Sequence, residues 1–248
     1  MDTLGEKLKF YELQTDYALS PDAYWVMRLD GNRFSKLTKK INAQKPYDEE
    51  FAEAIRKTTI DLMQKFGFVT GYCQSDEITL VPNLVEGNRN DLWGLRIQKL
   101  CSIVASYASV RFNNYLAERL GDIDAVFDAR VILLENLEEV RAAILWRQND
   151  CLKNAKNLCA QYYFTPKELH GLTSDEQIAL MLREKSVDFE TFPASFRYGS
   201  LFKRKQIPMQ GINPTNGEVS DVLRSVIYET NEYAPRTEFV LSKYWNEY

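Results

Sequence analysis

Apolar positions along the first half of the chain follow two spacings, one typical of strands and one typical of helices. Strand-like apolar runs occur at residues 24–29, 66–72, 78–81 and 125–134. Apolar residues recur every three or four positions over residues 34–41, 48–66 and 91–119. Only a short polar break separates the two middle strands, so they predict a hairpin. The order is therefore β-α-β-β-α-β, the ferredoxin-like arrangement that is also the frame of a polymerase palm.

The second half of the chain predicts a helical extension with short strands. Asn136 can cap a helix that runs to about residue 162, and Thr165 and Thr173 begin two further short helices. Residues 196–202 have a strand pattern, and no repeat, low-complexity tract or linker is visible. The pattern predicts an α+β fold and a single domain over residues 1–248. Its palm-like core would span about 20–135 and its extension about 136–248.

Acidic residues lie where the predicted strands meet. Asp30 ends the first strand, and the Gly31 that follows lets the backbone turn sharply and expose a carbonyl oxygen. Asp76 and Glu77 lie in the break of the hairpin, in place of the Asn-Gly or Asp-Gly of a plain tight turn. Taken alone, this break is more often an ordinary acidic turn. Together with Asp30, it offers the oxygen ligands that Mg²⁺ takes in two-metal phosphoryl or nucleotidyl transfer.

Composition narrows the possible functions. The chain is 45% hydrophobic, which is enough for a real core, and its net charge of −4 is unlike that of a nucleic-acid coat protein. No apolar run has the length of a membrane span, and the first residues resemble no secretory or transit signal. We therefore expect a cytoplasmic protein, with an organelle left open. The single histidine, His170, disfavours histidine-dependent triads and zinc enzymes, so catalysis is expected to rest on carboxylates, metal and basic side chains.

Two helical patterns carry further polar side chains. Arg96 and Lys99 lie three residues apart and project from one face of the predicted helix, which suits a triphosphate held near the metals. On the next helix, Arg147, Asp150 and Asn154 form a polar stripe. That stripe is either a solvated face or a contact with RNA.

A net negative protein that handles nucleic acid must do so through local basic patches. The run Lys203-Arg204-Lys205 is most often a solvated strand end. With three lysines of the first predicted helix, Lys36, Lys39 and Lys40, it can instead contact phosphates.

Taken in order, these segments resemble the tRNA-histidine guanylyltransferase superfamily, whose members add nucleotides in the 3′-to-5′ direction. Each segment is short, but the ordered set is specific. The matching segments, which together cover roughly residues 24–205, are Arg28 to Phe34, Lys45 to Asp48, Tyr72 to Glu77, Arg96 to Lys99, Phe127 to Val131, Trp146 to Cys151 and Arg197 to Ser200.

The resemblance implies a role for the matching residues. Asp30, the Gly31 carbonyl and Asp76 would bind two Mg²⁺ per active site, and Glu77 would support them as a third catalytic residue. ATP or GTP would be the activating and incoming nucleotides. The candidate nucleotide-binding residues are Arg28, Asn32, Arg33, Phe34, Lys45, Ser75, Arg96 and Lys99. Asn154 matches a position beside the tRNA end. With the basic and polar patterns, the candidate RNA contacts are Arg147, Asp150, Asn154, Lys203 and Arg204.

One departure from the family pattern bears on the substrate. Eukaryotic guanylyltransferases carry His-Ile-Asn-Asn after an Asp-Cys pair, whereas this chain has Leu152-Lys153-Asn154-Ala155. The difference favours the guanylyltransferase-like branch, which repairs truncated tRNA 5′ ends against the complementary strand. In that reaction ATP first adenylylates the 5′-monophosphate, and the 3′-hydroxyl of an incoming nucleotide then attacks. Base pairing would select the nucleotide, so the protein need read only shape and phosphates. The resemblance also implies a homotetramer.

Other functions remain open from the sequence. The first is addition of guanosine at position −1 of tRNA-histidine. The second is another palm-type cyclase or polymerase, although no Gly-Gly-Asp-Glu-Phe segment is present. The third, from a different class, is a catalytically silent tRNA-binding module. The intact acidic and basic residues disfavour this last reading, because packing does not require them.

Overall fold

The computed structural model describes residues 3–85, 89–121, 123–212, 215 and 218–246. Its strands form one antiparallel sheet in the order β4-β1-β3-β2-β5-β6. The strands are β1 Tyr24–Gly31, β2 Thr70–Gln74, β3 Glu77–Val81, β4 Phe127–Leu134, β5 Ser200–Ile212 and β6 Val219–Thr230. The first four have the order of the ferredoxin-like frame, so the predicted α+β, palm-like core is confirmed.

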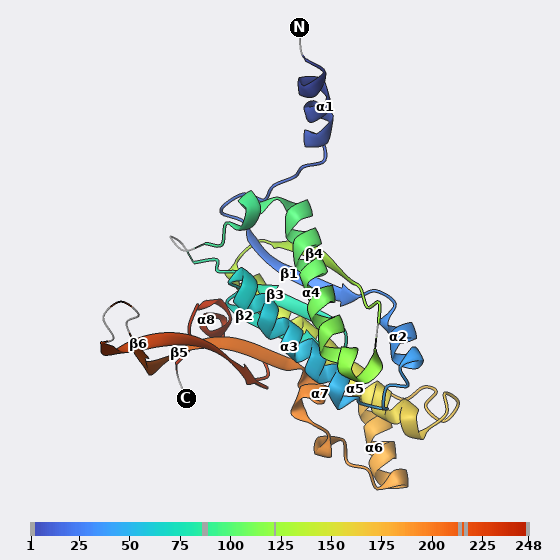
Figure 1. Ribbon diagram of the computed structural model, residues 1–248. Coiled ribbons are helices and arrows are strands. Elements are labelled where there is room, and N and C mark those ends of the chain that lie inside the picture. Colours follow the sequence, from blue (N-terminus) through green and yellow to red (C-terminus); the bar gives the residue numbers. More distant parts are fainter. Residues whose placement is uncertain (1–2, 86–88, 122, 213–214, 216–217, 247–248) are drawn as a thin grey trace.

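Two helices, α3 (Glu49–Phe66) and α4 (Ile97–Leu120), cover one face of the sheet (Figure 1). Beneath them, four phenylalanine rings from four elements meet with centroids 4.9–5.9 Å apart: Phe34, Phe51, Phe112 and Phe127. Burial of each ring contributes about 1.5–3 kcal/mol. Phe34 begins the short helix α2 (Phe34–Lys40), so this cluster fixes α2 against the end of β1.

The long helix α5 (Leu137–Tyr163) packs on the opposite face of the sheet, as its contacts with β1 and β4 indicate. Side chains alternate along β1, so Leu29 points toward α3 and α4 while Arg28 and Asp30 point toward α5. Three short helices and a 3-10 turn lie around α5, namely α6 (Ser174–Lys185), α7 (Ala194–Tyr198), α8 (Thr237–Leu241) and η2 (Phe189–Thr191). The acidic residues therefore face the α5 side of the sheet.

Helix boundaries were predicted well where a capping side chain is present. Asp48 accepts from the Phe51 amide at 2.9 Å and begins α3, and Asn136 accepts from the Glu139 amide at 3.0 Å and begins α5. Thr173 and Glu176 form the predicted capping box of α6. By contrast, Thr165 begins a series of turns rather than a helix.

Left-handed residues explain two wrong boundaries. The helix predicted from residue 91 begins at Ile97, because Trp93 (φ 54°) and Gly94 (φ 62°) interrupt it within the short turn η1 (Leu92–Leu95). The strand predicted at 196–202 is wrong up to Tyr198, which ends α7. Gly199 (φ 76°) then reverses the chain, and a Cβ there would collide with the Tyr72 hydroxyl.

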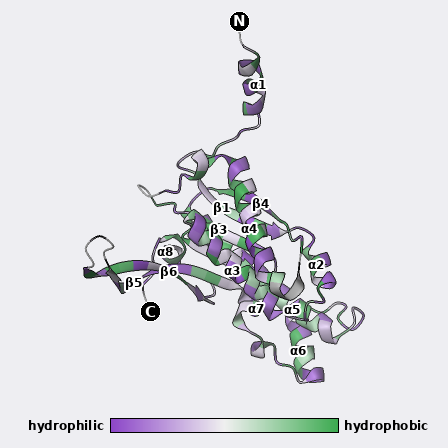
Figure 2. Cartoon of the chain, viewed as in Figure 1, coloured by the Kyte–Doolittle hydropathy of each residue, from purple (hydrophilic) through white to green (hydrophobic). Residues whose placement is uncertain are grey.

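The extension contains long strands rather than the short ones predicted. β5 has 13 residues and β6 has 12, and β5 pairs with β2 so that the hairpin continues the core sheet. Figure 1 shows the hairpin leaving the body of the protein, and Figure 2 shows green and purple residues mixed along it.

The main core takes residues from both halves of the chain, including Leu29 and Phe112 from the first and Ile144, Phe202 and Phe239 from the second. This shared core is what a single domain requires, and the single domain over residues 1–248 stays a prediction. Among the described residues, no helix is long and apolar enough to cross a membrane. The remaining helix, α1 (Leu4–Leu13), projects away from the body and buries none of its side chains (Figure 1).

Candidate active site

The end of β1 lies beside the turn that joins β2 to β3. Asp30 pairs with Glu77 across the β1–β3 ladder, and the Gly31 amide donates to the Asp76 carbonyl oxygen at 3.1 Å. The turn itself consists of Ser75, in the left-handed region at φ 48°, and Asp76. These contacts bring Asp30 and Asp76 to one corner of the sheet, which we call the acid corner and define by Asp30, Gly31 and Asp76.

The acid corner favours a bound cation. Burial and then the negative charge of Asp30 raise the pKa of Asp76 above its ordinary value. The Ser75 hydroxyl donates to Asp76 Oδ1 at 3.1 Å and partly opposes this shift. Because two neighbouring carboxylates repel each other in a partly buried place, a divalent cation between them would relieve the repulsion.

The donors at the acid corner fit Mg²⁺ shared with a substrate. Within the described part of the chain, no three His, Cys, Asp or Glu side chains gather closely enough to enclose an ion. Mg²⁺ is usually held by one or two carboxylates, with waters and substrate phosphates completing its octahedron. Asp30, Asp76 and the Gly31 carbonyl match that pattern, and they lack the nitrogen and sulfur ligands of a structural zinc site.

Glu77 has a different partner from the two aspartates. Arg147 of α5 donates from Nε to Glu77 Oε1 at 2.6 Å and from Nη2 to Oε2 at 2.8 Å. Burial raises the pKa of Glu77, although the charges of Arg147 and Arg28 act in the other direction. This bidentate pair joins α5 to the sheet directly beside the acid corner.

Three residues predicted to touch RNA thus lie in a chain of contacts that begins at Glu77. Arg147 Nη2 also donates to Asp150 Oδ2 at 3.0 Å, and Asn154 donates to the same oxygen at 3.1 Å. Only 12% of the Arg147 side chain is exposed, so its guanidinium is engaged by carboxylates rather than open to RNA. Asn154 lies on the exposed surface, where an RNA contact stays a prediction.

The site also contains an aromatic side chain, Trp146, for which the sequence predicted no role. The guanidinium groups of Arg28 and Arg147 lie over the Trp146 ring, 5.4 Å and 4.7 Å from its centroid. Trp146 is 56% exposed, which is unusual for so large an apolar residue. Its place off the apolar stripe of the predicted helix was the available signal.

The residues after Gly31 divide between core and surface. Asn32 and Arg33 are exposed, and the Asn32 amide donates to the Val126 carbonyl oxygen at 2.8 Å. Phe34 is only 2% exposed and belongs to the phenylalanine cluster, so the prediction that its side chain binds a nucleotide is wrong. The same ring explains Gly31, because a Cβ at that position would collide with it.

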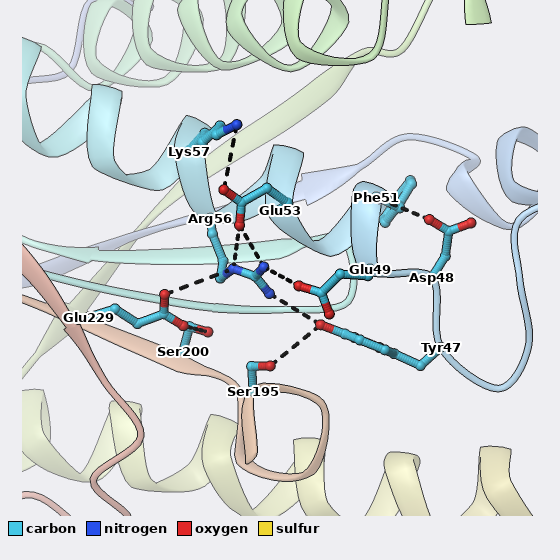
Figure 3. A network of polar contacts seen from close by, with 10 residues as sticks. All are labelled: Tyr47, Asp48, Glu49, Phe51, Glu53, Arg56, Lys57, Ser195, Ser200 and Glu229. Carbon is cyan, nitrogen blue, oxygen red and sulfur yellow. Dashed lines mark hydrogen bonds and ion pairs between the residues drawn. The ribbon is translucent and has the colours of Figure 1, made fainter. Parts of the chain in front are cut away.

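A network of hydrogen bonds and ion pairs holds the loop that contains Lys45 in place. Figure 3 shows Arg56 of α3 reaching toward Tyr47, whose hydroxyl lies between Arg56 and Ser195 of α7. Arg56 Nη1 donates to the Tyr47 hydroxyl at 3.1 Å, and the Gln44 amide donates to Asp48 Oδ2 at 2.8 Å. Both contacts flank Lys45, so they hold its backbone while its side chain remains exposed.

Arg96 and Lys99 do not lie beside the acid corner of the same chain. Arg96 precedes α4 in extended backbone, and its Nη2 lies 2.6 Å from Asp16 Oδ2. Further along α4, roughly 18 Å away, the Ser109 hydroxyl accepts from the Phe127 amide, next to Gly31. The expectation that Arg96 and Lys99 share one helix face near the metals within one chain is therefore wrong.

The basic run on β5 is largely internal. Lys203 is fully buried, and its Nζ donates to Thr70 Oγ1 at 2.7 Å, to the Val240 carbonyl oxygen at 3.3 Å and to the Ser242 carbonyl oxygen. Arg204 Nε donates to the Phe68 carbonyl oxygen at 3.0 Å. The prediction that Lys203 contacts RNA is therefore wrong, because its buried side chain joins the C-terminal segment to the sheet. Arg204 is partly exposed, and its contact with RNA stays a prediction.

The burial of Lys203 predicts a pH-dependent stability. Burial and the charge of Arg204 lower the pKa of Lys203 to about 7. Between that value and 10.5 the unfolded chain binds a proton that the folded chain has released, so stability rises with pH by about 1.4 kcal/mol per unit. In urea unfolding at pH 7 to 9, wild type should gain stability relative to Lys203→Met. Lys205→Met, on the same strand, should run parallel to wild type. Parallel curves for wild type and Lys203→Met would contradict the assignment.

The amino-acid sequence of this chain is similar to a known protein family. The family model described as tRNAHis guanylyltransferase matches residues 5–135. An uncharacterised protein of Acanthamoeba polyphaga mimivirus is 31% identical, over 98% of this chain and 91% of its own. A probable tRNA(His) guanylyltransferase of Dictyostelium discoideum is 26% identical, over 98% of this chain and 95% of its own.

Solved structures agree with the sequence matches. A bacterial tRNA(His) guanylyltransferase-like protein in complex with ATP has a TM-score of 0.76 and 30% identity, covering 82% of this chain and 87% of its own. A complex of such a bacterial protein with GTP has a TM-score of 0.72 and 27% identity, covering 93% and 92%. The Saccharomyces cerevisiae enzyme, at 22% identity and a TM-score of 0.70, shares the fold over 80% of this chain and 92% of its own.

Proposed function

Because the chain belongs to the tRNA-histidine guanylyltransferase family, we propose that this nucleotidyltransferase repairs truncated tRNA 5′ ends by template-directed, Mg²⁺-dependent 3′-to-5′ addition. The proposal rests on the acid corner, where Asp30 at the end of a strand and Asp76 in a tight turn lie together. ATP and GTP are the proposed activating and incoming nucleotides, in line with the two nucleotide complexes of similar bacterial proteins.

The reaction divides into two transfers. In the first, the tRNA 5′-phosphate attacks the α-phosphate of ATP, and pyrophosphate leaves. In the second, the 3′-hydroxyl of the incoming nucleotide attacks the 5′-phosphate, and AMP leaves. Asp30, Asp76 and the Gly31 carbonyl would hold Mg²⁺, which supplies Lewis-acid stabilisation of the phosphate charge. Lys45 and Ser75 would contact the nucleotide, and the Glu77–Arg147 pair would keep the acid corner in place.

The α5 surface supports repair over dedicated addition at position −1. Where the eukaryotic enzymes have the first residue of His-Ile-Asn-Asn, this chain has Leu152, which packs against the apolar cluster around Ala155 and Phe164. A packing residue there offers no hydrogen bond to a base, which favours selection of the nucleotide by pairing with the opposite strand. The family description and the curated relatives favour guanosine addition to tRNA-histidine as the second candidate function.

One assay separates these functions. A tRNA lacking its first nucleotide and a full-length tRNA-histidine, both with a 5′-monophosphate, are each incubated with ATP, Mg²⁺ and one nucleotide at a time. We expect addition to the truncated tRNA of the complementary nucleotide alone. Guanosine addition to full-length tRNA-histidine instead would establish the second function, and binding of both RNAs without any addition would indicate a silent module.

We also propose a cytoplasmic homotetramer. The large apolar side chains of α1, among them Leu4, Phe10 and Leu13, are more than half exposed, so a helix of this kind is suited to packing against another chain. Analytical ultracentrifugation should give a mass about four times the 28.8 kDa of the chain. A monomeric mass at micromolar concentration would contradict the assembly.

A further inference from the structure

The charged residues of the segment from residue 33 to residue 47 are all positive. The segment contains no Asp or Glu, although the whole chain has 35 acidic and 31 basic residues. The positive residues of the segment are Arg33, Lys36, Lys39, Lys40 and Lys45. All are exposed, and in the described part of the chain none of them forms an ion pair. A concentration of unpaired charge like this is unexpected in a protein of net charge −4.

Three of these charges share one face of α2. At 100° per residue, Lys36, Lys39 and Lys40 fall within about 100° of arc. The buried Phe34 and the partly buried Leu37 lie on the opposite side and attach the helix to the core. We call these three side chains the α2 lysine face. Because Phe34 packs in the phenylalanine cluster, α2 cannot rotate to bury these lysines without breaking the core.

Helix α2, which carries the lysine face, begins close to the acid corner. Only Asn32 and Arg33 separate Gly31 from α2, and the Gly31 and Asn32 amides are both bonded to neighbouring segments. α2 is about 10 Å long, similar to the Debye length of about 10 Å at 0.1 M salt. Figure 1 shows α2 at the periphery, at the end of β1 that carries Asp30. A polyanion whose end reaches the acid corner can therefore continue across α2.

We propose that the α2 lysine face binds the phosphodiester backbone of the RNA whose 5′ end enters the acid corner. This inference rests on the proposed function for the identity of the RNA. Lysines act as point charges on phosphates and read no bases. Such contacts suit a reaction in which the complementary strand chooses the nucleotide. They also offset, within a short range, the repulsion that a net negative protein presents to RNA.

The salt dependence of RNA binding tests the proposal. Lys36→Gln/Lys39→Gln/Lys40→Gln removes the face without altering the buried side of α2. A matched control, Lys65→Gln/Lys167→Gln/Lys185→Gln, removes three exposed lysines elsewhere. Binding of 5′-monophosphorylated truncated tRNA is measured from 50 to 300 mM salt. Each lost phosphate contact makes the slope of log Kobs against log salt shallower by about 0.7–0.9. The slope of the α2 variant should therefore be about 2–3 shallower than that of wild type. The control should keep the wild-type slope.

Further measurements separate this inference from the proposed function. Binding of ATP alone should be the same in wild type and the α2 variant. An unchanged slope for tRNA would overturn the α2 proposal, and so would a loss confined to ATP, which would make the face a triphosphate site. If the slope falls but wild type adds no nucleotide to any tRNA, the RNA contact stands and the proposed function fails.

Discussion

Replacing Asp30 or Asp76 by asparagine is expected to lower the rate of nucleotide addition by at least about a thousandfold. Asparagine keeps the shape but removes the negative charge that holds the metal. Metal stabilisation of phosphate charge is worth several kcal/mol, and each 1.36 kcal/mol is a factor of ten in rate. Single-turnover addition to truncated tRNA, with saturating ATP and Mg²⁺, measures the loss directly.

The same substitutions should leave the fold intact. Asp30 and burial together raise the pKa of Asp76, so the two carboxylates repel each other when no cation is bound. Removing one charge relieves that repulsion, and the melting temperature without metal should stay equal or rise. Asp124→Asn, an exposed aspartate just before β4, provides the control and should keep full activity. Full activity of Asp30→Asn or Asp76→Asn would show that the acid corner does not take part in catalysis.

Loss of Arg147 is expected to destabilise the protein by about 3–5 kcal/mol, because it leaves the Glu77 carboxylate buried without its partner. The side chains of Glu77 and Arg147 are only 13% and 12% exposed, and their two hydrogen bonds are 2.6 and 2.8 Å long. Urea unfolding of Arg147→Met at pH 7 measures the change. Activity should fall as well, since the pair ties α5 to the strand beside Asp76.

A double-mutant cycle isolates the pair. Glu77→Gln in the Arg147→Met background removes the unpaired charge and should recover part of the lost stability. Arg130→Met is a suitable comparison, because Arg130 and Asp128 form an ion pair in which both side chains are about half exposed, and it should cost less than about 1 kcal/mol. An equally small loss for Arg147→Met would show that the Glu77–Arg147 pair behaves as a surface pair.

Much of the fold could be predicted from sequence patterns that span only a few residues. The apolar spacing of α3, the Asp48 cap and the two-residue turn at Ser75 and Asp76 are each set by residues a few positions apart. The meeting of Asp30 and Asp76 could also be anticipated, because the ferredoxin-like order places β1 beside β3. Their roles as metal ligands remain predictions.

The errors arose where distant residues decide the outcome. Lys203 has the sequence context of a solvated strand end, but its partners Thr70 and Val240 come from β2 and α8. The long β5–β6 hairpin depends on pairing with β2, which no local signal reports. Likewise, the separation of Arg96 from the acid corner follows from the direction of α4 across the sheet, because Arg96 precedes the helix whereas Ser109, further along it, contacts Phe127 beside Gly31.

The most direct test of templated repair changes the RNA and leaves the protein unaltered. A truncated, 5′-monophosphorylated tRNA is prepared with each of the four bases opposite the missing position, and each version receives ATP, Mg²⁺ and one labelled nucleotide at a time. We expect the added nucleotide to change with the opposing base and to be its complement in every case. Addition of guanosine regardless of that base would contradict it.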